Sequence, residues 1–285
     1  MKSQNVNYKI ENSSINLALE GETFVGEPIT LVNQDVNLID DLSWLDQGFS
    51  VEEFLTPELY AQMQSGLKDM VKQLVLKFGG SVDDKFSLEN YHLYVDDETH
   101  LKIAKDIQPG WNVSSFPIDF NLVNERVSQA INKNVTAEAK HLGIYNYFLR
   151  IVRPQKFQDN NPPHRDVWID RLRNAVNIYV PVCGSSQDSS LPLVVGSHLA
   201  KESDIERTTD GAKLNGTKYS VPCVISYKGE SPNLIRPEIK ENEIMVFSPY
   251  MIHGQRYIHF LNGVLYLQLK NPANQVQVQD WWIQT

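Results

Sequence analysis

A histidine and an aspartate two positions apart, His164 and Asp166, are the side chains of this sequence best suited to chemistry. In an extended segment, residues i and i+2 point to the same face, so an imidazole and a carboxylate would stand side by side. A second histidine, His253, lies far along the chain, at the end of a strand-like run that Gly254 closes. We expect the three side chains to meet in one metal site.

Two histidines and one carboxylate on one face of a metal leave three coordination positions open. That ligand set is typical of non-haem iron(II) centres, whereas catalytic zinc commonly keeps a single open position. A histidine with an aspartate two residues on is a common chance match in a chain with seven histidines. The prediction of an iron site therefore depends on the combination with His253.

The composition indicates an acidic globular protein. The chain has 285 residues and a formal net charge of −9. Such a charge argues against nucleic acid and against anionic membrane surfaces as partners, because both are bound by basic surfaces. No stretch reaches the roughly 18 apolar residues of a membrane span, the first residues lack the apolar core of a signal peptide, and two cysteines provide no disulfide framework. We therefore expect a cytoplasmic protein that acts on a small molecule.

The first part of the sequence predicts short strands followed by helices. Turn signals divide residues 5–40 into short polar strands, which we expect to cover another part of the molecule. Thr56-Pro57-Glu58 is a helix start, and apolar residues then recur at steps of three and four as far as Gly79-Gly80. Residues 81–118 show no clean period, and a second helix is expected near Asp119.

From residue 143 the pattern changes to period two. In 175–182 the residues Val176, Ile178, Val180 and Val182 form one face, while Asn177 and Tyr179 form the other. Further strands are expected at 219–228, 234–239, 243–248 and 264–270. Many short strands without alternating helices predict a sandwich or barrel. The chain is interpreted as one domain, 1–285, with lead-in strands and supporting helices in 1–142, a β core in 143–272 and a C-terminal tail in 273–285.

Three stretches resemble the iron(II)/2-oxoglutarate-dependent oxygenases, and the phytanoyl-CoA dioxygenase-like proteins in particular. They are the strand at 175–182, the phrase 190–198 that ends in Gly-Ser-His, and the run 243–254 that contains His253. The stretch 48–58 is similar to the opening strand and helix of the same family. The resemblance covers roughly residues 45–80 and 144–270.

The resemblance implies a fold and a ligand set. The fold is a double-stranded β-helix, a cupin-like jelly roll that is mainly β with flanking helices. The implied ligands of iron(II) are His164, Asp166 and His253, with 2-oxoglutarate and O2 as co-substrates. Because residue 166 is an aspartate, hydroxylation of an unactivated C–H bond is favoured over halogenation.

The sequence departs from the family at the site for the distal carboxylate of 2-oxoglutarate. The family usually places an arginine at the head of the last strand and a serine two residues on, where this chain has Val264 and Tyr266. A buried carboxylate needs a cation. The favoured substitute is Arg256, Arg150 is a second candidate, and Lys270 lies further along the strand. Residues that could donate hydrogen bonds to this carboxylate are Tyr266, Asn177 and Tyr179. The alternative that this chain has lost the 2-oxoglutarate site, and is not an oxygenase, also stays open.

Three residues are candidates for contact with the prime substrate. Trp168 either lines the pocket or anchors its strand, and Trp111 lies in a loop that could set selectivity. Arg165 belongs to a cluster with Arg171 and Arg173, which forms either a solvated edge or a cationic rim for an anionic substrate. The predicted substrate is a small polar or anionic metabolite, such as a sugar or carboxylate derivative.

Two other functions stay open at this point. One is a metal-dependent cupin isomerase or lyase that does not use 2-oxoglutarate, which the missing late arginine favours. The other is a non-catalytic jelly-roll module that binds a sugar, since fold alone does not decide function. His198 is expected to hold a loop. The aromatic pair Trp281-Trp282 in the tail is expected to pack onto the core or into a homodimer interface.

Overall fold

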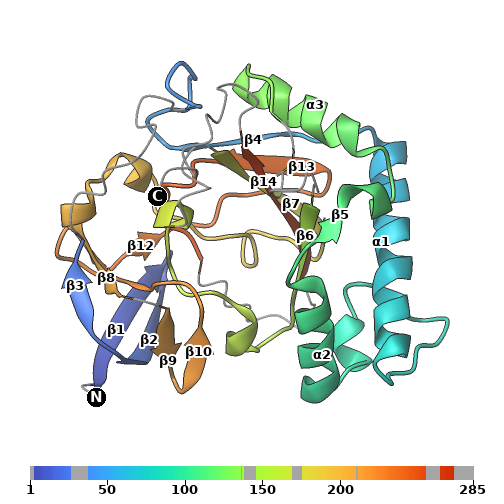
Figure 1. Ribbon diagram of the computed structural model, residues 1–285, viewed down its shortest axis with the longest axis horizontal. Helices are drawn as coiled ribbons and strands as arrows, with labels where there is room; N and C mark the ends of the chain where they lie inside the picture. Colours follow the sequence, from blue (N-terminus) through green and yellow to red (C-terminus); the bar gives the residue numbers. More distant parts are fainter. Residues whose placement is uncertain are drawn as a thin grey trace, which may run out of the picture.

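The computed structural model describes residues 3–26, 38–135, 137, 146–168, 175–209 and 211–254, together with the backbone of 264–272. Its centre is a six-stranded antiparallel sheet with helices along one side (Figure 1). The order of the strands across the sheet is β4-β13-β7-β14-β6-β5. Their bounds are β4 Phe49–Glu53, β5 Trp111–Asn112, β6 Asn146–Val152, β7 Ala175–Cys183, β13 Glu243–Phe247 and β14 Val264–Pro272.

A second layer consists of short extended segments joined by isolated bridges. His164 pairs with His253, His253 pairs also with Leu193, and Leu193 pairs with Ile235. The chain enters the two layers in turn, as β6, the His164 segment, β7, the Leu193 and Ile235 segments, β13, the His253 segment and β14. This winding is that of a double-stranded β-helix, so the predicted fold class is confirmed.

Apolar side chains fill the space between the two layers. The sheet contributes Tyr179, Met245 and Phe247, and the second layer contributes Leu193 and Met251. Each of these side chains is at most 1% exposed. The alternation predicted for β7 is confirmed, because its odd-numbered residue Tyr179 belongs to this inner core while its even-numbered valines and isoleucine belong to the outer one.

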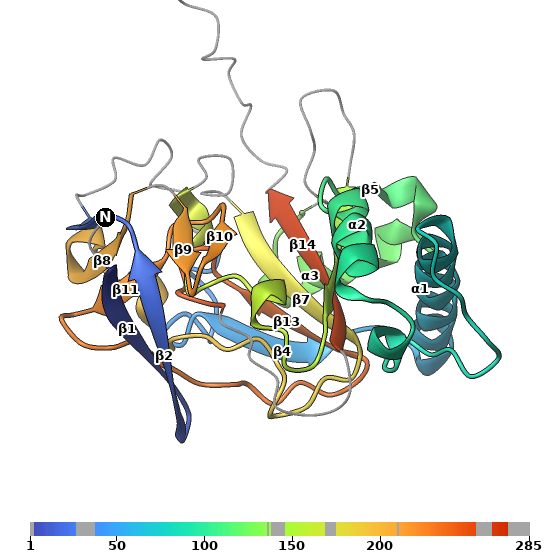
Figure 2. The same cartoon turned by 90° about the horizontal axis from the view of Figure 1, so that it is seen from below.

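Three helices cover the outer face of the six-stranded sheet, as Figure 2 shows from a second direction. They are α1 Pro57–Lys77, α2 Asp97–Ile107 and α3 Phe120–Ile131. Helix α1 begins as predicted, with the Thr56 hydroxyl accepting from the Leu59 N–H, and α3 begins after Asp119. Short 3₁₀ turns complete this part at η1 Tyr91–Leu93 and η2 Val113–Ser115.

Helix α2 lies in a stretch that shows no clean period. Asp96 caps its N-terminus by accepting from the Thr99 N–H, and His100, Ile103 and Ile107 are its buried residues. The period is hidden because a histidine occupies one of the three core positions. An amphipathic pattern counted on apolar residues alone therefore misses the helix.

The N-terminal strands cover the second layer from its other side. A five-stranded sheet has the order β10-β9-β2-β1-β12, and a three-stranded sheet has the order β11-β8-β3. Their core also contains Val194 and Ile252 of the second layer. The expectation that the first strands cover another part of the molecule is thus confirmed. The bounds are β1 Ser3–Ile10, β2 Ser13–Glu20, β3 Thr23–Val25, β8 Ile205–Thr208, β9 Ala212–Leu214, β10 Thr217–Tyr219, β11 Val224–Tyr227 and β12 Asn233–Leu234.

Four more 3₁₀ turns lie in the connections, at η3 Phe157–Asp159, η4 Asp166–Trp168, η6 Ser197–Leu199 and η7 Glu202–Asp204. Within the described residues, no helix is long and apolar enough to cross a bilayer. The C-terminal tail with Trp281 and Trp282 lies outside the described residues.

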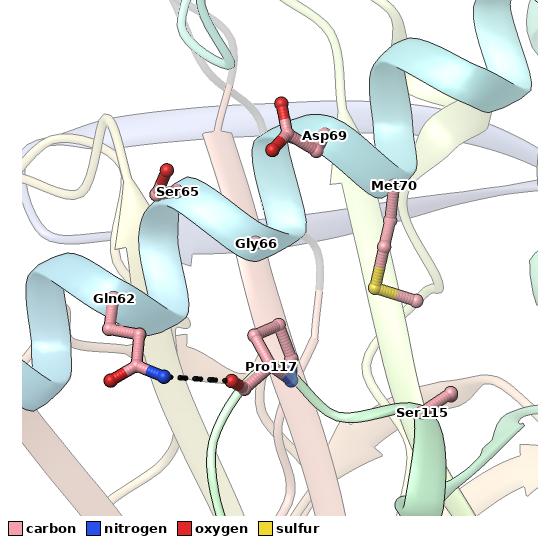
Figure 3. A pocket seen from close by; sticks show the side chains of 7 residues that line it. All are labelled: Gln62, Ser65, Gly66, Asp69, Met70, Ser115 and Pro117. Carbon is pink, nitrogen blue, oxygen red and sulfur yellow. Dashed lines mark hydrogen bonds between the residues drawn. The ribbon is translucent and has the colours of Figure 1, made fainter.

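Helix α1 approaches the segment after η2 closely at Gly66. Figure 3 shows Gly66 above Pro117 in a pocket of about 490 Å³, where Gln62 also donates to the Pro117 carbonyl at 3.3 Å. A Cβ at position 66 would lie 2.3 Å from the Cβ of Pro117. The glycine is therefore needed for close packing.

We expect Gly66→Ala to destabilise the protein despite the better helix propensity of alanine. The propensity gain is about 1 kcal/mol, whereas overpacking against a rigid proline ring costs about 1–3 kcal/mol. Urea unfolding followed by circular dichroism measures the difference. The matched control is Ser65→Ala at the adjacent, exposed position, and a Gly66→Ala protein as stable as this control would contradict the packing argument.

Candidate metal centre

The three predicted ligands converge in the interior. Nε2 of His164 lies 3.5 Å from Oδ1 of Asp166, and Nε2 of His253 lies 3.5 Å from Oδ2 of the same carboxylate. The three potential ligand atoms lie within 4.8 Å of one another. All three residues are buried, with exposures of 5%, 3% and 2% for His164, Asp166 and His253. Among the described residues they are the only such group of metal-ligating side chains.

Backbone carbonyls fix the orientation of both imidazole rings. Nδ1 of His164 lies 2.8 Å from the carbonyl oxygen of Pro162, and Nδ1 of His253 lies 3.0 Å from that of Met251. A carbonyl oxygen only accepts, so each Nδ1 carries the proton and donates it. Each Nε2 then presents its lone pair toward Asp166. This is the tautomer that a metal-binding histidine needs.

The backbone sets the spacing between the two histidines. His164 N–H donates to the carbonyl of His253 at 2.9 Å, and His253 N–H donates to that of His164 at 3.1 Å. Gly254 follows with φ of +123°, and a Cβ there would lie 2.6 Å from the Pro162 carbonyl oxygen. Only glycine accepts this backbone conformation readily and leaves that space.

The extended segment predicted around His164 and Asp166 ends earlier than expected. His164 lies in a bridge, but Asp166 begins the 3₁₀ turn η4. Asp166 N–H donates to the Pro249 carbonyl at 3.0 Å, which ties the turn to the chain that leads to His253. The aspartate therefore reaches the site from a turn rather than from alternation along a strand.

The donor set fits a divalent cation. A buried carboxylate is costly unless a positive charge compensates it, and the two imidazoles are held with their lone pairs toward it. Two nitrogen donors and one oxygen donor suit iron(II). The three donors would occupy one face of the metal and leave the opposite face open. His164, Asp166 and His253 are the residues that would hold the metal.

Arg165 lies between the two ligands in sequence, but it is an interior residue and not part of a rim. Its side chain is 1% exposed, and NH1 lies 2.8 Å from Oε1 of Glu202. NH2 donates to the carbonyls of Ser197 and Ala200. Burial lowers the pKa of the guanidinium. Both readings of an exposed Arg165, the solvated edge and the substrate rim, are therefore wrong. Arg171 and Arg173 lie outside the described residues.

Trp168 is an anchor in this arrangement. Its indole N–H donates to the Glu202 carboxylate at 3.1 and 3.2 Å, and the Arg207 guanidinium lies 4.5 Å from the ring centroid. Glu202 thus collects donors from both Arg165 and Trp168. It fastens the stretch that carries His164 and Asp166 to turn η7. Sequence reasoning missed Glu202, because it stands in a polar stretch without a motif.

Turn η6 connects the two halves of the site. The Ser197 hydroxyl accepts from the Ile252 N–H at 2.8 Å, next to His253, while the Ser197 carbonyl accepts from Arg165. Nε2 of His198 lies 2.6 Å from the Leu45 carbonyl, and burial lowers the pKa of this imidazole. His198 therefore holds a loop, as predicted. One serine contacts the neighbours of both histidine ligands.

The residues predicted to bind 2-oxoglutarate have different outcomes. Nδ2 of Asn177 donates to Oδ2 of Asp166 at 2.6 Å, and Tyr179 belongs to the inner core. Arg150 is half-buried, and its neighbours Leu149 and Ile151 belong to the outer core, so Arg150 faces the inner side. For Tyr266 only the backbone is described, and it pairs with Arg150. Arg256 lies outside the described residues.

Trp111 does not reach the metal centre. It pairs with Tyr147 at the edge of the six-stranded sheet, and the two rings pack edge to face at 5.9 Å. Both side chains belong to the outer core under the helices. The prediction that Trp111 contacts the substrate at this site is therefore wrong, and its aromatic ring serves the packing of the helices.

A charge cluster with a buried centre at Arg153 and Asp159, missed by sequence reasoning, fixes the connection between β6 and His164. Arg153 binds Asp159 with Nε at 2.8 Å and NH2 at 3.0 Å, and it binds Asp97 of α2 with NH1 at 2.6 Å. Nε2 of His100 lies 3.4 Å from Asp159, and Tyr91 contacts Nδ1 of His100. Burial by itself raises the pKa of Asp159, but the contacts with His100 and Arg153 outweigh it, so the pKa lies below its ordinary value.

Neither a comparison of the sequence with models of protein families nor one with characterised proteins gives a match. Several solved structures are similar. AviO1 from Streptomyces viridochromogenes Tue57 shares 10% identity over 84% of this chain and 97% of that chain, with a TM-score of 0.48. EctD from S. alaskensis, solved with 2-oxoglutarate and 5-hydroxyectoine, shares 11% identity over 90% of this chain and 86% of its own, with a TM-score of 0.48.

A third similar structure is SnoK, described as a non-haem α-ketoglutarate-dependent carbocyclase from nogalamycin biosynthesis. It shares 9% identity over 84% of this chain and 86% of its own, with a TM-score of 0.44. These likenesses concern the fold alone. The double-stranded β-helix of this chain rests on its own strand order and bridges.

We expect Glu202→Gln to destabilise the protein by about 3 kcal/mol, because it leaves the buried Arg165 guanidinium without its ionic partner in a site of unchanged shape. Thermal and urea unfolding of the metal-free protein measure the loss. Glu230→Gln, at an exposed position, is the control. Equal stability of the two variants would show that the Arg165–Glu202 pair does not hold the ligand segment.

The Asp159 cluster predicts a dependence of stability on pH. The folded-state pKa of Asp159 is lowered, so its contribution is fully present above the unfolded-state pKa of about 4 and is lost as the pH falls through the folded-state pKa. We expect Asp159→Asn to be less stable at pH 7 and to have a flatter acid limb below about pH 4. The exposed Asp84→Asn serves as control. Parallel acid limbs for wild type and Asp159→Asn would refute this assignment.

Proposed function

We propose that the protein is a non-haem iron(II)- and 2-oxoglutarate-dependent dioxygenase that hydroxylates an unactivated C–H bond of a small polar or anionic metabolite. The observation that carries the proposal is the convergence of His164, Asp166 and His253 between the two layers of the double-stranded β-helix. Similar folds among the solved structures include the carbocyclase SnoK and EctD, which is described with bound 2-oxoglutarate. That likeness supports the choice of chemistry.

The chain's own residues supply position and environment for this chemistry. When bound, iron(II) together with 2-oxoglutarate and O2 supplies the oxidising power for hydroxylation. His164 and His253 hold their lone pairs in fixed directions through the bonds at Nδ1. Asp166 contributes negative charge that balances part of the metal's charge. The burial of all three keeps bulk water from the reacting atoms.

Arg150 is the cation that we propose for the distal carboxylate of 2-oxoglutarate. It lies on the inner side of β6, opposite Tyr266 in the register of the sheet. A guanidinium can bind a carboxylate with two parallel hydrogen bonds. No hydrogen bond or ion pair occupies Arg150 within the described part of the chain. Arg256, the substitute favoured from the sequence, remains the competing candidate.

One other reading has an observation in its favour. Val264 stands where the resembling family usually has its arginine, and its backbone is paired at the start of β14. A metal-dependent isomerase or lyase would need the three ligands but no cation for 2-oxoglutarate. The sugar-binding alternative gives no reason for three buried metal-ligating side chains to meet, so the geometry disfavours it.

The proposal predicts that the protein loaded with iron(II) binds 2-oxoglutarate and, given O2, releases succinate even without prime substrate at a slow rate. His253→Ala should lower iron affinity by more than roughly 100-fold, since even residues behind metal ligands contribute about 10- to 100-fold. His92→Ala, which removes a histidine of turn η1 that is not among the three ligands, is the control. Anaerobic iron titration, oxygen uptake and succinate assay are the measurements.

Two variants separate the candidates for the co-substrate cation. Arg150→Leu should weaken 2-oxoglutarate binding by roughly 100-fold and leave iron affinity unchanged, because a lost charge-assisted pair is worth about 3 kcal/mol. If Arg256→Leu has that effect instead, the cation is Arg256. Tight iron binding without any 2-oxoglutarate binding by the wild type would favour the isomerase or lyase reading.

A further inference from the structure

Asn177 contacts the carboxylate ligand directly and is not exposed at all. It lies in β7, its neighbour in register is Phe247 of β13, and its exposure is 0%. Its Nδ2 donates to Oδ2 of Asp166 at 2.6 Å. A hydrogen bond this short to a carboxylate is charge-assisted and stronger than one between neutral groups. Asn177 therefore controls how Asp166 can present its two oxygens.

The orientation of the amide is settled by chemistry. An ionised carboxylate only accepts, so the NH2 group and not the carbonyl oxygen of Asn177 must face Asp166. Oδ1 of Asn177 is then directed away from Asp166, and it is buried without a hydrogen-bond partner among the described residues. The co-substrate 2-oxoglutarate offers carboxylate and keto oxygens, which are acceptors too. From the sequence, Asn177 is one of three residues expected to be able to donate to the distal carboxylate. In the structure one of the two N–H groups of its amide donates to Asp166.

A carboxylate can bind a metal through one oxygen or through both. Oδ1 of Asp166 lies 3.5 Å from Nε2 of His164, and Oδ2 lies 3.5 Å from Nε2 of His253. The two oxygens differ in that Oδ2 also carries the bond from Asn177. Each carboxylate oxygen has two lone pairs, so the bond from Asn177 occupies one lone pair of Oδ2 and makes this oxygen a weaker metal donor than Oδ1. Binding through both oxygens is therefore disfavoured. It would also fill a fourth position on a metal that already has two histidines and Oδ1.

We propose that Asn177 is a positioning residue that limits Asp166 to one metal–oxygen bond and so keeps three coordination positions open for the reactants. This inference rests on the proposed function and deepens it. It attributes the number of open coordination positions on the metal to the hydrogen bond from Asn177, a residue that is not itself a metal ligand. Without that bond, Asp166 rotates to bind with both oxygens, and 2-oxoglutarate meets a metal with one position fewer.

The test uses Co(II) as a spectroscopic probe in wild type and in Asn177→Leu, which has a similar volume and no donor. We expect the variant to bind Co(II) as tightly as wild type, within about threefold, because its carboxylate gains a metal bond in place of a hydrogen bond. Its visible absorption should become weaker and change shape as the coordination number rises. The affinity of the Co(II) protein for 2-oxoglutarate should fall by about tenfold, a difference of about 1.4 kcal/mol.

The matched control is Asn146→Leu, which removes a buried asparagine from β6 whose Nδ2 donates to the Pro109 carbonyl at 3.3 Å. Its Co(II) spectrum should equal that of the wild type. Asn177→Ala is the second variant in case leucine prevents folding, and it should show the same spectral change. A crystal structure of the Co(II)-loaded Asn177 variant should show both oxygens of Asp166 on the metal.

The outcomes separate this inference from the proposed function. A variant with weaker Co(II) binding, lower stability and an unchanged spectrum would give Asn177 a purely structural role and overturn the inference. A variant identical to wild type in all measurements would overturn it as well. In both cases the wild type still binds Co(II) and 2-oxoglutarate, so the proposed function stands. A wild-type protein that binds no metal would overturn both.

Discussion

The pair of backbone hydrogen bonds between His164 and His253 is the constraint on which the site depends. It joins two segments that are remote in sequence and sets their side chains beside Asp166. Burying a carboxylate and two imidazoles in this way is unfavourable without a compensating charge. The surrounding hydrogen bonds hold the three side chains in place, so they cannot move apart to relieve this cost. A preorganised, electron-rich pocket is the result, and a divalent metal is the partner that such a pocket suits.

Support for the pocket comes from residues that do not face the metal. Glu202 holds the ligand segment through Arg165 and Trp168, and Ser197 contacts both halves of the site. These groups are ionic or strongly polar although they are buried, so their geometry is specific. Apolar packing alone would permit small rotations of the ligands. The ion pair and the serine bonds restrict them, which is how residues behind a metal ligand tune its affinity.

Much of the fold and of the metal site could be predicted from the sequence, but not the features that depend on contacts between residues far apart in the chain. The metal ligands were accessible because three ligating residue types stand at the ends of strand-like runs, and β7 was accessible because its apolar residues alternate. Helix α2 was hidden by His100 in a core position. Arg165 was misjudged because a charged residue is normally exposed, and only the position of Glu202 in space reverses that expectation. The second layer forms isolated bridges that are too short to leave a periodic pattern.

The arrangement of the second layer has a consequence for how the molecule is made. The His253 segment lies between those of His164 and Leu193, although it follows both in the chain. The second layer is therefore continuous only after the His253 segment has been inserted between the two earlier segments. Contacts of such high sequence separation form slowly. During biosynthesis a nascent chain would carry His164 and Asp166 without their third partner until the His253 segment, which lies far along the sequence, has been made. Metal binding by all three ligands then follows the insertion of the His253 segment, rather than providing a nucleus around which the layer folds.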